Sequence, residues 1–154
     1  KLMASGGGDN TVRVWEMETG KELTVLKGHE APVTAVAFLE DNRTLASVSE
    51  DKVLKIWDAR DGKLRATLEK EKGPSSEVPC LQPAGKGRLR AWAATDLIET
   101  YDTERGQQAG TVNVKAGAEK ITSLCFSGDG KKAAVGGQDG KVRIFDIDAA
   151  KGPG

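Results

Sequence analysis

One stretch decides how this chain folds: LASVSEDKVLKIWD, residues 45–58. The apolar and β-branched residues of 44–49 predict a strand, and the polar turn formers at 50–52 interrupt it. Residues 53–57 are apolar apart from Lys55 and include the β-branched Val53 and Ile56, which predicts a second strand. The turn carries a carboxylate, Asp51, and the second strand ends on an indole, Trp57. The stretch therefore predicts two antiparallel strands joined by a tight turn.

The pairing of a turn aspartate with an aromatic residue five or six positions later occurs four times. Successive copies are 42 to 45 residues apart, which is the period expected of β-propeller blades. The pairs are Asp9 with Trp15, Asp51 with Trp57, Asp96 with Tyr101, and Asp139 with Phe145. This repeat predicts four-stranded antiparallel units that bury their apolar faces only by stacking on one another.

The second repeat contains the whole predicted unit, with strands at 33–38, 44–49, 53–57 and 64–68. Residues 71–82, which include Gly, Pro and Ser, are predicted to form an irregular connection in place of an ordinary approach to the next blade. Applying the same division to the whole chain gives repeat one at 2–28 without its first strand, repeat two at 28–70, a degenerate repeat three at 71–116, repeat four at 117–148 without its last strand, and a tail or linker at 149–154.

The predicted fold is all-β: a partial propeller of about three and a half four-stranded antiparallel blades, belonging to a larger ring of the seven-blade type. A β-sandwich also satisfies the strand count, but it does not require the aspartate and the aromatic to recur at one period. Because an open ring exposes strand edges, we expect the remaining blades to come from a longer chain. Closure as a four-blade ring and pairing of two copies are alternatives that fit the strand inventory less well.

The repeats resemble a known family. The residues that carry the resemblance are Gly28, His29, Leu45, Ala46, Ser47, Asp51, Ile56, Trp57 and Asp58, with Ser5, Asp9, Trp15 and Glu16 matching most of the pattern in repeat one. Together they are similar to the signature of the WD-repeat β-propellers. The resemblance implies a hydrogen-bond chain within the blade, formed by His29, Ser47, Asp51 and Trp57, with Ser5, Asp9 and Trp15 at the corresponding places of repeat one.

Hydrogen-bond chemistry supports such a chain independently. An aspartate can accept from an imidazole, the second imidazole nitrogen can meet a hydroxyl, and a buried indole N–H needs an acceptor. A buried network costs free energy when one member is missing, so its members should be present together or replaced together. Repeat four fits the second case, because Val135 and Phe145 stand in place of Ser47 and Trp57. Asp139 is therefore expected to act only as a turn former.

Composition disfavours several classes of function. The 23 basic and 23 acidic residues cancel, so no overall charge attracts nucleic acid or acidic lipid. His29 is the single histidine, and alone it cannot assemble a common zinc site or serve as a free catalytic base. We therefore expect no catalysis, no metal and no cofactor. The two cysteines, Cys80 and Cys125, fall in predicted strands and are expected to be reduced, as in cytoplasmic or nuclear proteins. No membrane segment is expected.

The resemblance implies a non-catalytic scaffold that docks other proteins or peptides within a multisubunit complex. The contact positions it implies are loops at one end of the blades: Glu30, Ala31, Pro32, Glu50 and Gln138. An RNA-associated subunit of a ribonucleoprotein is the alternative, supported by the basic segment at 86–90 with Lys86, Arg88 and Arg90.

Overall fold

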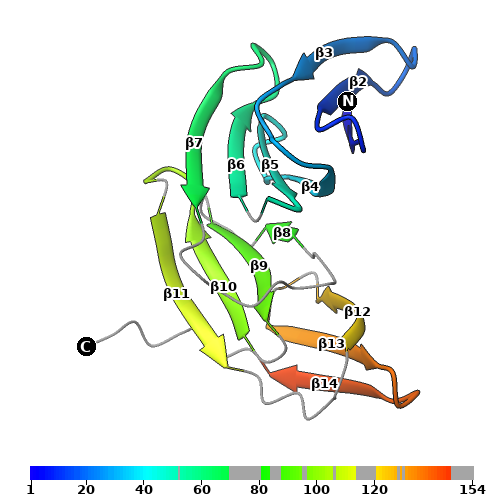
Figure 1. The fold of residues 1–154 in the computed structure, drawn as a ribbon, viewed down its shortest axis with the longest axis vertical. Helices are drawn as coiled ribbons and strands as arrows, with labels where there is room; N and C mark the ends of the chain where they lie inside the picture. Colours follow the sequence, from blue (N-terminus) through cyan, green and yellow to red (C-terminus); the bar gives the residue numbers. More distant parts are fainter. Residues whose placement is uncertain are drawn as a thin grey trace. The chain divides into compact units, whose positions relative to one another are not determined.

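The computed structural model describes residues 1–51, 53–69, 81–83, 88–94, 97–105, 107–113, 121–127, 129 and 131–146. All regular structure within these residues is β-strand, arranged in four antiparallel sheets (Figure 1). Each sheet is a meander, because strands that follow one another in the sequence are also hydrogen-bonded neighbours. The prediction of an all-β fold built from antiparallel blades is confirmed. The chain divides into two compact units, Lys1–Glu71 with Thr103–Gly106, and Lys72–Asp102 with Gln107–Gly154.

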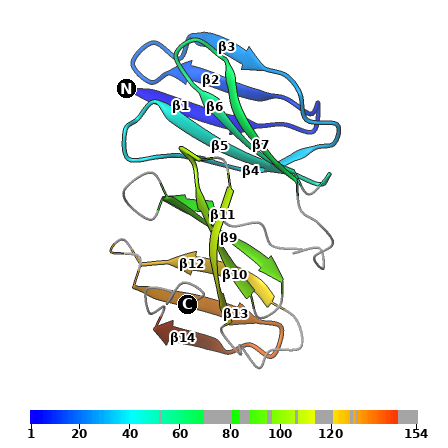
Figure 2. The ribbon, with the colours of Figure 1, turned by 90° about the vertical axis from the view of Figure 1, so that its left-hand side faces the viewer.

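The first unit contains two of the sheets, one of three strands and one of four (Figure 2). The three-stranded sheet consists of β1 (Leu2–Gly6), β2 (Val12–Glu16) and β3 (Glu22–Leu26). The four-stranded sheet consists of β4 (Val33–Phe38), β5 (Thr44–Ser49), β6 (Val53–Asp58) and β7 (Leu64–Glu69). The register of β5 on β6 places Ser47 opposite Lys55 and Thr44 opposite Asp58. The decisive hairpin of the sequence therefore forms the middle of the second sheet.

The core of the first unit lies between its two sheets. Val12 and Val14 of β2, both 0% exposed, belong to the same buried cluster as Leu45 and Trp57 of the second sheet. The backbones also meet, since the Val33 amide donates a hydrogen bond of 3.0 Å to the Gly7 carbonyl. This is the stacking of neighbouring blades that the repeat requires.

One glycine sets how closely these sheets approach. A Cβ atom at position 6 would lie 2.6 Å from Cγ1 of Val33, which is well inside van der Waals contact. Only glycine at the end of β1 therefore permits the observed distance between β1 and β4.

The second unit contains the other two sheets. One consists of β8 (Leu81–Pro83), β9 (Arg88–Ala94), β10 (Leu97–Asp102) and β11 (Gln107–Asn113). The other consists of β12 (Ile121–Phe126), β13 (Lys132–Gly137) and β14 (Val142–Asp146). The side-chain amide of Gln82 donates to the Ser127 carbonyl at 3.2 Å, which links the two sheets.

The structure corrects the prediction that 71–82 is irregular to its end. Leu81 and Gln82 begin the strand β8, which pairs with β9, whereas 71–80 lie outside the described residues. Three residues ending in proline gave too short a signal to be recognised as a strand. Pro83 is tolerated because β8 is the edge of its sheet, where a missing backbone donor breaks no ladder. The repeat boundaries 2–28, 28–70, 71–116 and 117–148 remain predictions, and 149–154 lie outside the description.

Candidate functional site

The loop end of the second sheet brings four of the expected residues together. The Ser47 hydroxyl oxygen lies 2.7 Å from Nε2 of His29 and accepts the indole N–H of Trp57 at 2.8 Å. Nδ1 of His29 lies 3.5 Å from Oδ2 of Asp51, which is longer than a normal hydrogen bond. The rings of His29 and Trp57 meet edge to face, with their centroids 6.2 Å apart. Because His29, Ser47 and Trp57 are all buried, the group fixes the interior of the blade.

The protons of this chain can be placed from the donors available. An indole N–H only donates, so Ser47 accepts from Trp57, and its own hydrogen is free to bond Nε2 of His29. The imidazole proton then lies on Nδ1 and faces Asp51. Burial lowers the pKa of His29 below 6.5, and the charge of Lys55 adds to this effect while Asp51 opposes it. The imidazole is consequently neutral at pH 7.

Asp51 fixes the turn through backbone hydrogen bonds, while Nδ1 of His29 faces it without a hydrogen-bond partner among the described residues. Its carboxylate accepts the backbone N–H of Val53 at 2.8 Å and that of Glu30 at 3.0 Å. Burial alone would raise the pKa of Asp51, but the Ser49 side chain and these backbone donors outweigh it, and the pKa falls below 3.8. The ionised aspartate therefore ties the loop before β4 to the turn after β5.

Gly28, the residue before His29, lies close to the Trp57 ring. Its φ of +145° is a conformation that L side chains rarely adopt, and a Cβ there would lie 3.4 Å from the Trp57 ring. Glycine at position 28 therefore allows the backbone conformation that places the His29 imidazole next to the Trp57 ring.

The first sheet contains part of the same arrangement. The Trp15 indole N–H donates to the Ser5 hydroxyl at 2.9 Å, as Trp57 does to Ser47. Asp9, by contrast, accepts an Arg13 N–H at 2.9 Å and the Thr11 hydroxyl at 2.7 Å. The Arg13 guanidinium and Thr11 lower the pKa of Asp9 to about 2. The turn aspartate thus pairs with an arginine here and with a histidine in the second sheet.

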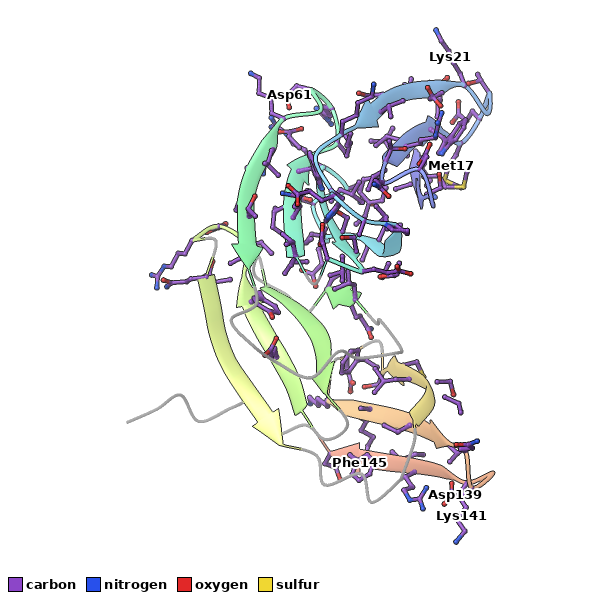
Figure 3. The ribbon with its side chains drawn as sticks, in the orientation of Figure 1. Met17, Lys21, Asp61, Asp139, Lys141 and Phe145 are labelled. Atoms are coloured by element: carbon purple, nitrogen blue, oxygen red, sulfur yellow. The ribbon has the colours of Figure 1, made fainter. Side chains whose placement is uncertain are left out.

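The last sheet repeats the arginine arrangement and corrects an expectation. Asp139 lies in the turn between β13 and β14 (Figure 3), and its two carboxylate oxygens accept Arg143 N–H groups at 3.2 and 2.6 Å. Arg143 lowers the pKa of Asp139 to about 2. Asp139 is therefore more than a turn former. The signal that was overlooked is an arginine four residues after the aspartate, shared by Arg13 and Arg143, where the second sheet has Lys55.

The expected contact residues of the second sheet lie around its network. The Glu30 amide is held by Asp51, and the Glu50 amide donates to the Pro32 carbonyl at 3.0 Å. The side chains of Glu30 and Glu50 are exposed, whereas Ala31 and Pro32 are half-buried. Their main chain is thus fixed while two carboxylates reach solvent.

Other expected contacts lie elsewhere. Gln138 is exposed in the turn that also holds Asp139. Arg88 and Arg90 are alternate residues of β9, and Lys86 lies outside the described residues. Beside the second-sheet network, an open groove of about 560 Å³ is lined by Arg13, Lys27 and His29, among others.

Among the described residues there is no group of three or more His, Cys, Asp or Glu side chains able to hold a metal ion. Cys125 is a free and exposed thiol, while Cys80 lies outside the description. Within that description, no helix has the length and apolar character needed to cross a bilayer.

Known proteins resemble this chain over most of its length. It is 26% identical to the Periodic tryptophan protein 2 of Saccharomyces cerevisiae over 98% of the chain and 12% of that protein. It is 28% identical to the WD repeat-containing protein VIP3 of Arabidopsis thaliana, over 97% of the chain and 50% of that protein. It is 29% identical to the U3 small nucleolar RNA-associated protein 15 of Schizosaccharomyces pombe, over 93% of the chain and 28% of that protein. The chain therefore spans half or less of the length of these relatives.

The family model described as WD domain, G-beta repeat matches residues 1–16, 20–58 and 109–146, which is more than half of the chain. The matched segments contain both tryptophan–serine pairs and all three turn aspartates whose side-chain partners are described above. Sequence and geometry agree, and the chain belongs to the WD40 repeat family.

Proposed function

We propose that this chain is part of a non-catalytic WD-repeat scaffold that holds other proteins within a multisubunit complex. The observation that carries the proposal is the loop end of the second sheet, where exposed side chains extend from a fixed backbone. Glu30 and Glu50 are exposed, and their amides are bound by Asp51 and Pro32. A contact surface that is already ordered loses little conformational entropy on binding, which favours partner recognition.

The nature of the exposed side chains supports docking rather than chemistry. Glu30 and Glu50 supply negative charge, and the half-buried Ala31 and Pro32 supply a small apolar step between them. The one histidine is neutral and hydrogen-bonded to Ser47, so it is committed to the blade. Gln138 occupies the place before the turn aspartate in the last sheet, as Glu50 does in the second. We propose Glu30, Ala31, Pro32, Glu50 and Gln138 as partner contacts.

The remaining blades of a propeller are the second class of partner that we propose. Three and five residues after the turn aspartate, Val12 and Val14 are 0% exposed, because the second sheet packs against them. The corresponding Val142 and Ile144 of β14 are 73% and 68% exposed. Exposed apolar residues at positions that are buried elsewhere in the same chain support a further blade packing on this face. The greater length of the relatives allows for such blades.

The scaffold proposal is tested by purifying the full protein from its own cells in two forms. One form carries Glu30→Lys and Glu50→Lys, which reverse the rim charge. The other carries Lys131→Glu, a charge reversal at an exposed turn of the last sheet. We expect stoichiometric partner proteins to copurify with the wild type and with Lys131→Glu, and at least one to be lost from the rim variant. Identical partner sets in all three would refute the assignment of the rim, and no stoichiometric partner would refute the scaffold.

A ribonucleoprotein subunit is the second candidate. Two observations favour it: the alternation of Arg88 and Arg90 on one strand, and the relative named a U3 small nucleolar RNA-associated protein. Nuclease treatment during the purification distinguishes the candidates. Partners retained after RNA digestion support protein docking, whereas loss of all partners, together with salt-dependent RNA binding that Arg88→Ala and Arg90→Ala abolish, supports the RNA role. In both cases we propose a cytoplasmic or nuclear location.

A further inference from the structure

Two arginine side chains and the backbone amide of a third arginine meet one aspartate at the end of the second sheet opposite the histidine network. Asp58 closes β6, and its side chain is only 4% exposed. Its Oδ2 accepts Nε and Nη2 of Arg43, both at 2.7 Å, and a very short hydrogen bond from Nη2 of Arg65. Its Oδ1 accepts the backbone N–H of Arg60 at 3.0 Å. We call Arg43, Arg60 and Arg65 the arginine cluster.

The aspartate does not use the full capacity of these side chains. A guanidinium carries five N–H donors. Arg43 directs two of its nitrogens to Asp58, and Arg65 divides its own between Asp58 and the Thr44 hydroxyl at 3.0 Å. Because the side chains of Arg43 and Arg65 are 49% and 39% exposed, their other N–H groups have access to solvent. The buried carboxylate holds the two guanidinium groups together at the surface.

Carboxylates also lie at this end of the sheet. Asp58 faces Arg43 and Arg65, and it is ionised because burial, which raises its pKa, is outweighed by the hydrogen bonds from Arg60, Arg65 and Arg43. Asp41 lies nearby and accepts the Thr44 hydroxyl at 2.6 Å. It is the second carboxylate of the group.

The turn between β6 and β7 adds the remaining charges. Asp61, labelled in Figure 3, pairs with Lys63 at 3.6 Å. Arg60 is exposed, and its side chain has no ion-pair partner among the described residues. With Glu40 of the turn between β4 and β5, which is also exposed, the carboxylates of this end match its cations, so the arginines offer a ligand exposed N–H donors and not a surplus of charge.

The same end of the last sheet shows that this assembly is not general to the repeat. Asp146 corresponds to Asp58, and it is paired with a single lysine, Lys132, at 2.6 Å. Its side chain is 79% exposed. One exposed ion pair has no fixed geometry to offer a ligand, whereas planar guanidinium groups held by a buried carboxylate do.

We propose that the arginine cluster, Arg43, Arg60 and Arg65, binds a phosphomonoester group carried by a phosphorylated side chain of a partner protein. Guanidinium groups recognise phosphate oxygens through pairs of parallel N–H donors, and clusters of arginine are a recurring means of reading phosphorylated segments. The site is distinct from the rim at Glu30 and Glu50, so it extends the scaffold function instead of restating it.

The flanking carboxylates favour one phosphoryl group over a nucleic acid strand. Asp41 is exposed and Asp61 lies in the adjacent turn, so both would repel a chain of phosphates passing over the cluster. An extended basic track is what RNA binding needs. A single dianion between the guanidinium groups gains their attraction and avoids the neighbouring acids.

The test follows the arginine side-chain N–H resonances of the full chain by NMR while phenyl phosphate is added at pH 7.5. We expect saturable shifts of the Arg43 and Arg65 signals. Arg60→Ala removes a side chain that makes no described contact, and we expect it to weaken binding about threefold to fivefold by deleting one exposed charge. Lys131→Ala, an equal loss of charge at the turn of the last sheet, is the control and should leave binding unchanged.

Three results would overturn the proposal. The first is the absence of saturable shifts in a protein whose backbone spectrum shows it to be folded. The second is equal weakening by Arg60→Ala and Lys131→Ala, which would indicate only a diffuse charge effect. The third is that a single-stranded RNA oligonucleotide saturates the same signals at a lower concentration than phenyl phosphate, which would make nucleic acid the ligand. Arg65→Lys, which keeps the charge but loses the planar fork, should bind less tightly than the wild type.

Discussion

The indole N–H of Trp57 donates to the hydroxyl of Ser47 at 2.8 Å, and both side chains are buried. The same hydroxyl is 2.7 Å from Nε2 of His29, so one oxygen serves two rings that come from different parts of the blade. A first-sheet counterpart, Trp15 with Ser5 at 2.9 Å, lies in a more exposed environment. The two pairs therefore offer a direct comparison of one hydrogen bond at two depths.

Replacing Ser47 with alanine should destabilise the protein by about 2 kcal/mol or more, because two buried polar groups lose their partner at once. The matched change Ser5→Ala should cost less than about 1 kcal/mol, since water can replace the lost hydroxyl at an exposed site. Urea unfolding followed by tryptophan fluorescence measures both. Equal losses for the two variants would show that burial does not control the value of this hydrogen bond.

Stability should depend on pH through His29. Its pKa in the folded state lies below the value of 6.5 expected when unfolded, so the unfolded chain takes up more protons as the pH falls through 6.5 and below. Stability is therefore complete above about pH 6.5 and decreases toward pH 5.5. The urea midpoint measured at pH 7.5 and at pH 5.5 tests this. Since His29 is the only histidine, His29→Gln should be less stable at pH 7.5 and should lose most of the difference between the two pH values.

The repeat of turn aspartate and aromatic was sufficient to predict blades. Its period is a property of the sequence alone and indicates the strands on either side of each turn, while the register that places Ala46 opposite Ile56 comes from the structure. The positions of His29, Ser47, Asp51 and Trp57 could be expected because the resemblance and hydrogen-bond chemistry indicated the same four residues. Such local and periodic features can be recognised without coordinates.

Other features depend on which residues meet across the sheet. Arg65 lies seven residues after Asp58 and twenty-two after Arg43, and only the pairing of β5, β6 and β7 brings the three together. The contact of Gly6 with Val33 likewise depends on how one sheet approaches the next. The ion pair of Asp139 with Arg143 could have been predicted from their spacing of four residues. It was missed because the turn aspartates were interpreted only as partners of a histidine.

Replacing Gly6 with alanine should force β1 away from β4. The new methyl group would lie 2.6 Å from Cγ1 of Val33 and 3.1 Å from its carbonyl oxygen, so the backbone must move, and overpacking of this kind costs about 1 to 3 kcal/mol. Gly8→Ala is the control, because a Cβ there would have no neighbour within 4 Å. Urea unfolding compares the two. Equal stability of Gly6→Ala and Gly8→Ala would show that the sheets separate at no cost and that their packing is loose.

Neutralising Asp58 should be more damaging than neutralising Asp146. Asp58→Asn keeps the volume of the side chain but leaves the guanidinium groups of Arg43 and Arg65 close together without the charge that holds them. Asp146→Asn removes one partner of an ion pair with Lys132 whose carboxylate is 79% exposed, where water and salt already screen the attraction. The urea midpoint should therefore fall clearly for Asp58→Asn and little for Asp146→Asn. Raising the salt concentration should restore part of the stability lost in Asp58→Asn. The guanidinium groups of Arg43 and Arg65 are partly exposed, so salt screens the repulsion between them. If the two variants lost equal stability, the buried carboxylate would not be the centre on which the arginines assemble.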